Sequence, residues 1–328
     1  MALRDAMRAE GVHVRELWRE PGEGKLLRLL TFQARGLGVI RSCDVVYARW
    51  HVLDWAHVVM ARMFRKPLVL EVNGTADDIV NQNPALRRFV RFLTWMSKHT
   101  LRAADHVIVV SPGLKTWVET QAPDLSITFL ANGADAELAK HGRPKANPPY
   151  AVFVGELARH QGIDTLLAAR DHADWPEGLS LVVIGDGALA GEVQAAADGI
   201  TIDYRGRLAQ AEAHDVLARA SVSISPQSGR VPRNRYGVTP LKVSESLMLG
   251  TPVVASRLPG LETIVANSGA GAVVQPDDPG ALARGVRAAA ALDEPGREAL
   301  RLYATNRLSW RSVASDTVRI CAGLSRQR

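Results

Sequence analysis

Two series of short apolar strands, each interleaved with amphipathic helical segments, run along the sequence. The first series has predicted strands at 44–48, 67–74, 106–111 and 126–135. The second has them at 151–155, 179–187, 200–206, 221–226, 251–256 and 270–276. Apolar strands separated by helices are typical of parallel sheets that are covered on both faces. We therefore predict an α/β protein with two Rossmann-like, doubly wound domains that face each other across a cleft.

A segment without apolar periodicity, at 141–150, separates the two series. It contains Gly142, Pro144, Pro148 and Pro149, a composition that indicates an interdomain linker. The predicted domains are therefore 1–143 and 144–310, followed by a helix at 311–328 that crosses back to the first domain.

Charge and cysteine content exclude several classes of protein. The net charge is +6, and residues 1–143 hold 20 basic against 15 acidic side chains, an excess that a solvated surface accounts for. We predict no nucleic-acid partner, because the basic residues form no recognised nucleic-acid-binding module. Two cysteines, no apolar stretch of about 20 residues and no secretory leader predict a cytoplasmic protein. The early G-x-G-x-x-G loop of a dinucleotide oxidoreductase is also missing.

Three loops of the second series are candidates for ligand binding, because they follow predicted strands. Residues 155–162 have glycine at both ends, which allows a ligand to approach the backbone, although many α/β loops look alike. Residues 184–187, Ile-Gly-Asp-Gly, fit a tight turn better than a ligand contact. In the third loop, 225–245, Thr239 is predicted as a helix N-cap with Pro240 at the first helical position. Amides near Val238 to Leu241 would then hold a diphosphate, with Lys242 adding a cation.

Six blocks in order resemble the family-4 retaining glycosyltransferases of the GT-B fold. They are Asn-Gly-Ala-Asp at 132–135, the V-G…Q-G-I-D block at 154–164, V-I-G-D-G at 183–187, Y-R-G-R-L at 204–208, S-I-S-P at 223–226 and P-L-K-V-S-E-S-L-M-L-G-T-P-V-V-A-S at 240–256. Leu308-Ser309-Trp310 resembles the family's crossover helix, so that the likeness covers roughly residues 44–310.

The resemblance implies an enzyme that moves a sugar from a nucleoside diphosphate, UDP- or GDP-linked, with retention of configuration and no cofactor or metal. Glu245 matches the glutamate that contacts the ribose, and Arg49, with His51 nearby, matches a strand-end residue facing the reacting sugar. Glu71 and Asn73 would lie on the acceptor side. The implied donor site comprises Gly155, Arg159, Gln161, Gly206, Arg235, Gly237, Val238, Thr239, Leu241, Lys242 and Glu245.

Several positions depart from the family pattern. Gly237 stands where many relatives have a glutamate, and Glu156 and Gln161 stand where many have arginine and lysine. These changes occur together in a subgroup with P-L-K before the glutamate, and Arg159, Arg235 and Lys242 could supply the missing charge. The family's first strand and Gly-Gly loop have no counterpart here, so we expect either a truncated start or an incomplete active site.

The sequence is also consistent with two other functions. A non-catalytic sugar-nucleotide-binding or scaffold relative and a sugar-nucleotide epimerase of the same fold are the alternatives. The acceptor would be a glycan, a lipid-linked sugar or a small molecule, which suggests cell envelope polysaccharide synthesis.

Residues 84–102 combine five cations with apolar side chains and would contact the inner membrane surface, or else pack as an ordinary helix on the sheet. The cations are Arg87, Arg88, Arg91, Lys98 and Arg102, and the apolar residues are Leu86, Phe89, Phe92, Leu93, Trp95 and Met96.

Overall fold

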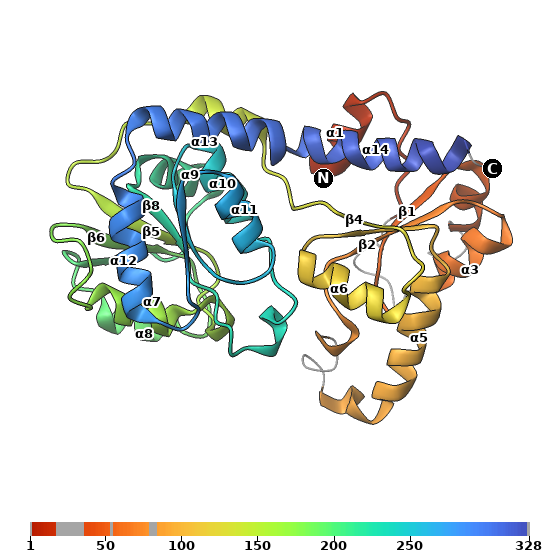
Figure 1. The fold of residues 1–328 in the computed structure, drawn as a ribbon, viewed down its shortest axis with the longest axis horizontal. Coiled ribbons are helices and arrows are strands. Elements are labelled where there is room, and N and C mark those ends of the chain that lie inside the picture. Colours follow the sequence, from red (N-terminus) through yellow and green to blue (C-terminus); the bar gives the residue numbers. More distant parts are fainter. Residues whose placement is uncertain (1, 18–35, 53–54, 79–83, 327–328) are drawn as a thin grey trace. The chain divides into compact units, whose positions relative to one another are not determined.

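The computed structural model describes residues 2–17, 36–52, 55–78 and 84–326. It divides the chain into two compact units (Figure 1). Unit 1 comprises Met1–Ala131 and Ala314–Arg328, and unit 2 comprises Asn132–Val313.

Unit 1 is built on a four-stranded parallel sheet. Its strands β1 (Val46–Arg49), β2 (Leu68–Val72), β3 (His106–Val109) and β4 (Ile127–Phe129) are ordered as in the sequence. Every residue of β2 and β3 is buried, which explains why both strands are apolar apart from Glu71 and His106. Its helical elements with described bounds are α1 (Ala2–Ala9), α3 (Ala56–Met63), η1 (Pro84–Phe89), α5 (Val90–Arg102), α6 (Pro112–Gln121) and the later part of α14 (Trp310–Arg326), and residues 36–42 and 76–78 are helical as well.

Unit 2 contains a six-stranded parallel sheet in the order β10-β9-β8-β5-β6-β7. The strands are β5 (Tyr150–Val154), β6 (Ser180–Ile184), β7 (Ile202–Tyr204), β8 (Val222–Ser225), β9 (Val253–Ser256) and β10 (Gly271–Val274). The helical elements are η2 (Ala136–His141), η3 (Arg159–Gln161), α7 (Ile163–Arg170), α8 (Ala190–Ala196), α9 (Gln210–Arg219), η4 (Pro232–Asn234), α10 (Leu241–Met248), α11 (Leu261–Asn267), α12 (Pro279–Ala290) and α13 (Glu294–Arg307).

The core of unit 2 lies where the sheet meets α7 and α12. Phe153 of β5, Leu181 of β6 and Ile224 of β8 pack with Leu166 of α7 and Leu282 of α12, and each is almost fully buried. The structure confirms the predicted strands and a parallel α/β architecture in both units, and in unit 2 the strand order reverses as it does in a doubly wound sheet.

The structural boundary lies earlier than the predicted one at 143/144. Residues 132–143 belong to unit 2, because Ala134 bridges to Ser309 and η2 packs against α10 and α13. The proline-rich segment was a misleading signal, since the chain has already joined unit 2 before reaching it. At the other end, unit 1 takes up the chain again at Ala314, within α14, whereas the prediction placed the returning helix at 311–328.

Candidate functional site

The order of strands in unit 2 creates a switch point between β5 and β8. From β5 the chain proceeds to β6 and β7 on one side, and β8 is followed by β9 and β10 on the other. The loops that leave the carboxyl ends of β5 and β8 therefore diverge, and the crevice outside such a switch point is where open α/β sheets bind ligands. These loops are 155–162 and 226–240, which lie within two of the stretches predicted from the sequence, 155–162 and 225–245.

The two loops are held together through their backbones. Gly162 has φ +72°, and a Cβ at this position would lie 1.9 Å from the carbonyl oxygen of Pro226. The amide of Ser228 donates to the carbonyl of His160 at 3.2 Å, and the Asn234 side chain donates to the same carbonyl at 2.7 Å. Glycine is therefore required at position 162 by both conformation and space.

Lys242, on the first turn of α10, has its side chain in this region. Its Nζ donates to Oε1 of Gln161 at 2.9 Å and lies 4.0 Å from the centroid of the Phe153 ring. An ideal Cβ on Gly155 would be 3.2 Å from the same amine. Lys242 is buried, and the burial lowers its pKa from 10.5 to about 7. The structure thus places a buried amine at the ends of β5 and β8.

A chain of amide side chains holds the acceptor of this amine. Oε1 of Gln161 also accepts from Nε2 of Gln227 at 3.2 Å, and Oε1 of Gln227 accepts from the Ser225 hydroxyl at 2.9 Å. Nε2 of Gln161 lies 3.3 Å from Nε2 of His160. Because an amide nitrogen can only donate, this ring nitrogen must be the acceptor, which requires a neutral imidazole. Burial lowers the pKa of His160, in agreement with a neutral ring.

The start of α10 differs from the sequence prediction. Pro240, with φ −64° and ψ 137°, is the N-cap, the helix begins at Leu241, and no side chain caps it. The predicted cap, Thr239, accepts instead from Asn132 Nδ2, at 3.0 Å on its carbonyl and 3.3 Å on its hydroxyl. The amide of Val238 donates to Pro259 at 3.1 Å and is therefore not free for a ligand, contrary to the prediction. Helix geometry leaves the amides of Leu241 and Lys242 without intrahelical partners.

Glu245 lies on the same helix, partly buried, and pairs with a histidine. Its Oε1 is 3.4 Å from Nε2 of His214, and about a fifth of each side chain is exposed. His214 comes from α9, which packs against α10. This partner was missed because a single histidine on an amphipathic helix carries no signal in the sequence.

The remaining predicted donor residues are more scattered. Arg159 and Arg235 are exposed, and the guanidinium of Arg235 lies over the Tyr236 ring at 5.6 Å. Gly206 accepts from the amide of Gly185 at 2.8 Å, a contact between loop backbones. Gly237 has φ +81°, and a Cβ there would lie 1.9 Å from the carbonyl oxygen of Pro259. The backbone conformation and the close contact therefore both require glycine at this position.

In unit 1, the predicted acceptor-side residues meet at the ends of β1 and β2. The buried carboxylate of Glu71 accepts from Tyr47 Oη, from Asn73 Nδ2 at 2.6 Å and from Arg49 at 3.4 Å. Burial raises the pKa of Tyr47, with Glu71 contributing, so the phenol stays protonated and donates. Three quarters of the Arg49 side chain is exposed. His51 is also exposed.

Three of the four acids in the pairs at 77–78 and 277–278 accept hydrogen bonds from backbone amides. Asp78 accepts from the amide of Thr75 at 2.7 Å, Asp277 accepts from Gly229 at 2.9 Å, and Asp278 caps α12 by accepting from Ala281 at 2.8 Å. In the part of the chain that the structure describes, no three potential ligands gather as a metal site would require.

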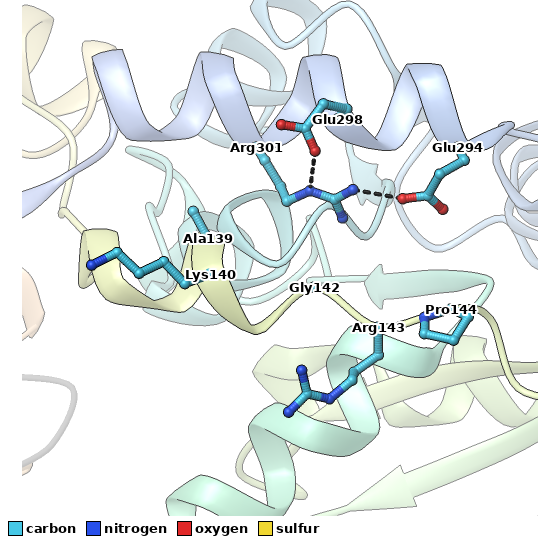
Figure 2. Close-up of a pocket in the computed structure, with 8 residues that line it drawn as sticks. All are labelled: Ala139, Lys140, Gly142, Arg143, Pro144, Glu294, Glu298 and Arg301. Carbon is cyan, nitrogen blue, oxygen red and sulfur yellow. Dashed lines mark hydrogen bonds and ion pairs between the residues drawn. The ribbon is translucent and has the colours of Figure 1, made fainter.

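A surface hollow of about 470 Å³ lies elsewhere in unit 2, between η2 and α13 (Figure 2). Its Arg301 already pairs with Glu294 at 2.6 Å and with Glu298 at 2.7 Å. Of its other cations, Lys140 pairs with Glu137 and Arg143 lies 3.7 Å from Asp215. Because its cations already have acidic partners, this hollow is a poorer anion site than the ends of β5 and β8.

Both parts of the chain match known family models. Residues 2–138 match the model described as Glycosyltransferase Family 4, and residues 148–291 match the one described as Glycosyl transferases group 1. The chain is a glycosyltransferase. This glycosyltransferase is 27% identical over 307 residues to a glycogen synthase of Mycobacterium tuberculosis, covering 87% of this chain and 70% of that protein. It is 24% identical over 261 residues to the D-rhamnosyltransferase WbpZ of Pseudomonas aeruginosa, covering 75% and 64%.

Solved structures support the GT-B fold of this glycosyltransferase. Sucrose-phosphate synthase from Thermosynechococcus elongatus aligns with a TM-score of 0.69 at 18% identity, covering 99% of this chain and 92% of that one. Anabaena HepE in complex with UDP aligns with a TM-score of 0.71 at 15% identity, covering 98% and 89%. At these identities the likeness shows the fold alone.

Proposed function

We propose that this glycosyltransferase transfers a hexose from a nucleoside-diphosphate sugar, UDP- or GDP-linked, and that unit 2 binds the donor. The observation that carries the proposal is the buried Lys242 amine at the carboxyl ends of β5 and β8. A diphosphate can supply the negative charge that such a buried cation lacks. HepE, one of the structural neighbours, has been solved with UDP-glucose.

In this proposal Lys242 and the first amides of α10 bind the diphosphate, and Glu245 accepts hydrogen bonds from ribose hydroxyls. A helix N-terminus and a nearby cation favour an anion in the same place. In a transfer with retention, the nucleoside diphosphate would depart from the same face of the sugar that the acceptor attacks. The developing charge on the diphosphate would then be stabilised by Lys242 and the helix amides.

In this proposal, residues of unit 1 bind the acceptor. Arg49 and Asn73 are anchored to the buried Glu71 and sit at or just after strand ends, where parallel sheets place ligand-binding side chains. Since Glu71 already accepts three hydrogen bonds, we assign it the positioning of Arg49 and Asn73, which would contact a glycan, a lipid-linked sugar or a small acceptor. His51 would lie near the acceptor as well.

We also propose that the surface of η1 and α5 contacts an anionic membrane and brings the enzyme to a lipid-linked acceptor. The apolar residues of the predicted amphipathic helix are divided between two faces: Leu93 and Met96 are buried, whereas Phe89, Phe92 and Trp95 are about half exposed. The rings of Phe92 and Trp95 stack at 6.0 Å. Residues 84–102 carry five cations and no acid, and each cation near an anionic bilayer contributes about 1 kcal/mol. The Leu86 side chain lies outside the described residues.

None of the helices described in the structure has the length and apolarity needed to cross a membrane. The proposed contact is therefore an interfacial one, in which aromatic rings enter the headgroup region and arginines bind phosphates.

The function is tested with purified protein and a small set of donors. We expect UDP-glucose or GDP-mannose to raise the melting temperature, and the bound donor to be hydrolysed, with water taking the sugar and nucleoside diphosphate being released. Equilibration of two donor epimers without an acceptor would identify an epimerase instead. Donor binding without turnover of any kind would identify a non-catalytic relative.

A further inference from the structure

The side chains around Lys242 form a connected network within unit 2. Ser225 donates to Gln227, Gln227 donates to Gln161, and Gln161 accepts from Lys242 as well. Ser225 and Gln227 are buried, each with about 1% of its surface exposed. The network fixes the orientation of both amides, since each oxygen already has its donors. An amide oxygen, unlike a carboxylate, holds the amine without neutralising it.

We propose that Gln161 is a positioning residue for Lys242, and that binding of a nucleoside diphosphate transfers a proton from the buffer to the Lys242 amine. The inference rests on the proposed function, because it concerns the same donor site. Before binding, the amine has an amide oxygen and an aromatic ring as neighbours. After binding, it has an anion, which favours the ammonium form.

The electrostatic surroundings support this coupling. Burial, with no charged side chain of the described residues contributing, lowers the pKa of Lys242 to about 7. Burial and nearby cations, Lys242 among them, lower the pKa of His160, so that a charged Lys242 disfavours a protonated imidazole. On α10 itself the other charged group is Glu245, and the loops around Lys242 carry Glu156, Arg159, His160, Arg230, Arg233, Arg235 and Tyr236. The charged or titratable groups of the helices packed against α10 are Glu137, Lys140 and His141 on η2, Glu212, His214, Asp215 and Arg219 on α9, and Glu294, Arg297, Glu298, Arg301, Tyr303 and Arg307 on α13.

The direction of the pH dependence follows from this arrangement. Below pH 7 the free protein already carries the ammonium, so donor affinity should be constant. Above pH 7 the amine must gain a proton on binding, and affinity should fall by up to about tenfold per pH unit. Nucleotide sugars are suitable probes, because the diphosphate that links the nucleoside to the sugar does not titrate near pH 7.

The test is isothermal titration calorimetry of UDP-glucose or GDP-mannose at pH 8 in two buffers with different ionisation enthalpies. We expect uptake of about one proton per donor in the wild type. Gln161→Glu should abolish the uptake, because a carboxylate keeps the amine protonated beforehand. Gln161→Leu should weaken binding about tenfold and increase the proton uptake measured at pH 7, because the free amine loses an acceptor that stabilises its charge. Gln194→Leu, an exposed glutamine on α8, is the matched control and should change neither quantity.

Three other results of the calorimetry would contradict the proton uptake by Lys242. Donor binding without proton uptake at pH 8 would overturn this inference and leave the proposed function standing. Uptake that persists in Lys242→Met and disappears in His160→Gln would assign the proton to the histidine and also overturn it. If UDP-glucose, GDP-mannose and ADP-glucose all fail to bind the folded wild type, the proposed function fails, and this inference fails with it.

Discussion

Nζ of Lys242 lies 2.9 Å from Oε1 of Gln161, although the two residues are 81 positions apart in the sequence. The contact joins the loop that follows β5 to the helix that follows β8, on the two sides of the point where the strand order reverses. A buried amine held by an amide destabilises the folded protein and favours an anionic ligand. The proposed binding of the donor diphosphate depends on this contact between Lys242 and Gln161.

Replacing Lys242 by methionine should stabilise the protein while weakening donor binding. Between pH 7 and 10.5 the folded wild type binds fewer protons than the unfolded chain, so its free energy of unfolding rises with pH. Methionine removes the cost of the buried charge, which we expect to add roughly 2–4 kcal/mol at pH 6.5. Urea unfolding at pH 6.5 and pH 9.5 measures the difference, which should shrink at the higher pH. A variant less stable than the wild type at pH 6.5 would contradict the expectation.

Gly162→Ala should be far more damaging than Gly199→Ala, although the two glycines have φ +72° and +73°. The Cβ at position 162 would collide with Pro226, whereas nothing lies within 4 Å of the one at position 199. We expect a loss of about 1 kcal/mol for Gly199→Ala and of more than about 3 kcal/mol for Gly162→Ala. Thermal unfolding of both variants checks this, and equal losses would show that the contact of the two loops is not rigid.

Glu245→Gln should reduce donor affinity by about 10- to 100-fold, because hydrogen bonds to charged groups contribute roughly 1.5–3 kcal/mol. His214→Ala should have a smaller effect of the same sign, since the histidine only orients the carboxylate. Glu192→Gln, an exposed glutamate on α8, is the control. Calorimetry with the donor separates the three, and an unchanged affinity in Glu245→Gln would remove this residue from the site.

The double variant Phe92→Glu/Trp95→Glu should release the protein from vesicles that contain anionic phospholipid. Both rings are more than half exposed, so the free energy of unfolding should change by less than about 0.5 kcal/mol. Ile200→Glu, at an 80% exposed position of unit 2, provides the matched apolar control. Flotation with anionic and neutral vesicles measures the effect. Equal flotation of the wild type and the double variant would refute a membrane contact through α5.

Most of the fold could be predicted from the sequence, because its signals are local. Buried strands such as 68–72 and 106–109 are short, mostly apolar segments with valine or isoleucine, and Pro112 after Ser111 marks the start of α6, which Ser111 caps. The prediction for Thr239 was wrong for a non-local reason: its hydroxyl is used by Asn132, 107 positions away. The contacts of Lys242 with Gln161 and of Glu245 with His214 could not be predicted for the same reason, since these residues become neighbours only in the folded chain.

The α5 helix shows a second limit of sequence analysis. The sequence left open whether its apolar residues contact a membrane or pack on the sheet, and the structure buries Leu93 and Met96 in the core together with Leu101. Phe89, Phe92 and Trp95 remain outside. Periodicity indicates an amphipathic helix, but the packing partner decides which apolar side chains are left for another surface.

The measurement that tests the central claim most directly compares donor binding by the wild type, Lys242→Met and Lys140→Met, by calorimetry at pH 7 with UDP-glucose or GDP-mannose. Lys140 is an exposed lysine whose ion pair with Glu137 lies on the surface. We predict that Lys140→Met binds as the wild type does and that Lys242→Met binds at least about tenfold more weakly while remaining folded. Equal affinity in all three proteins would contradict the claim that the buried amine receives the donor diphosphate.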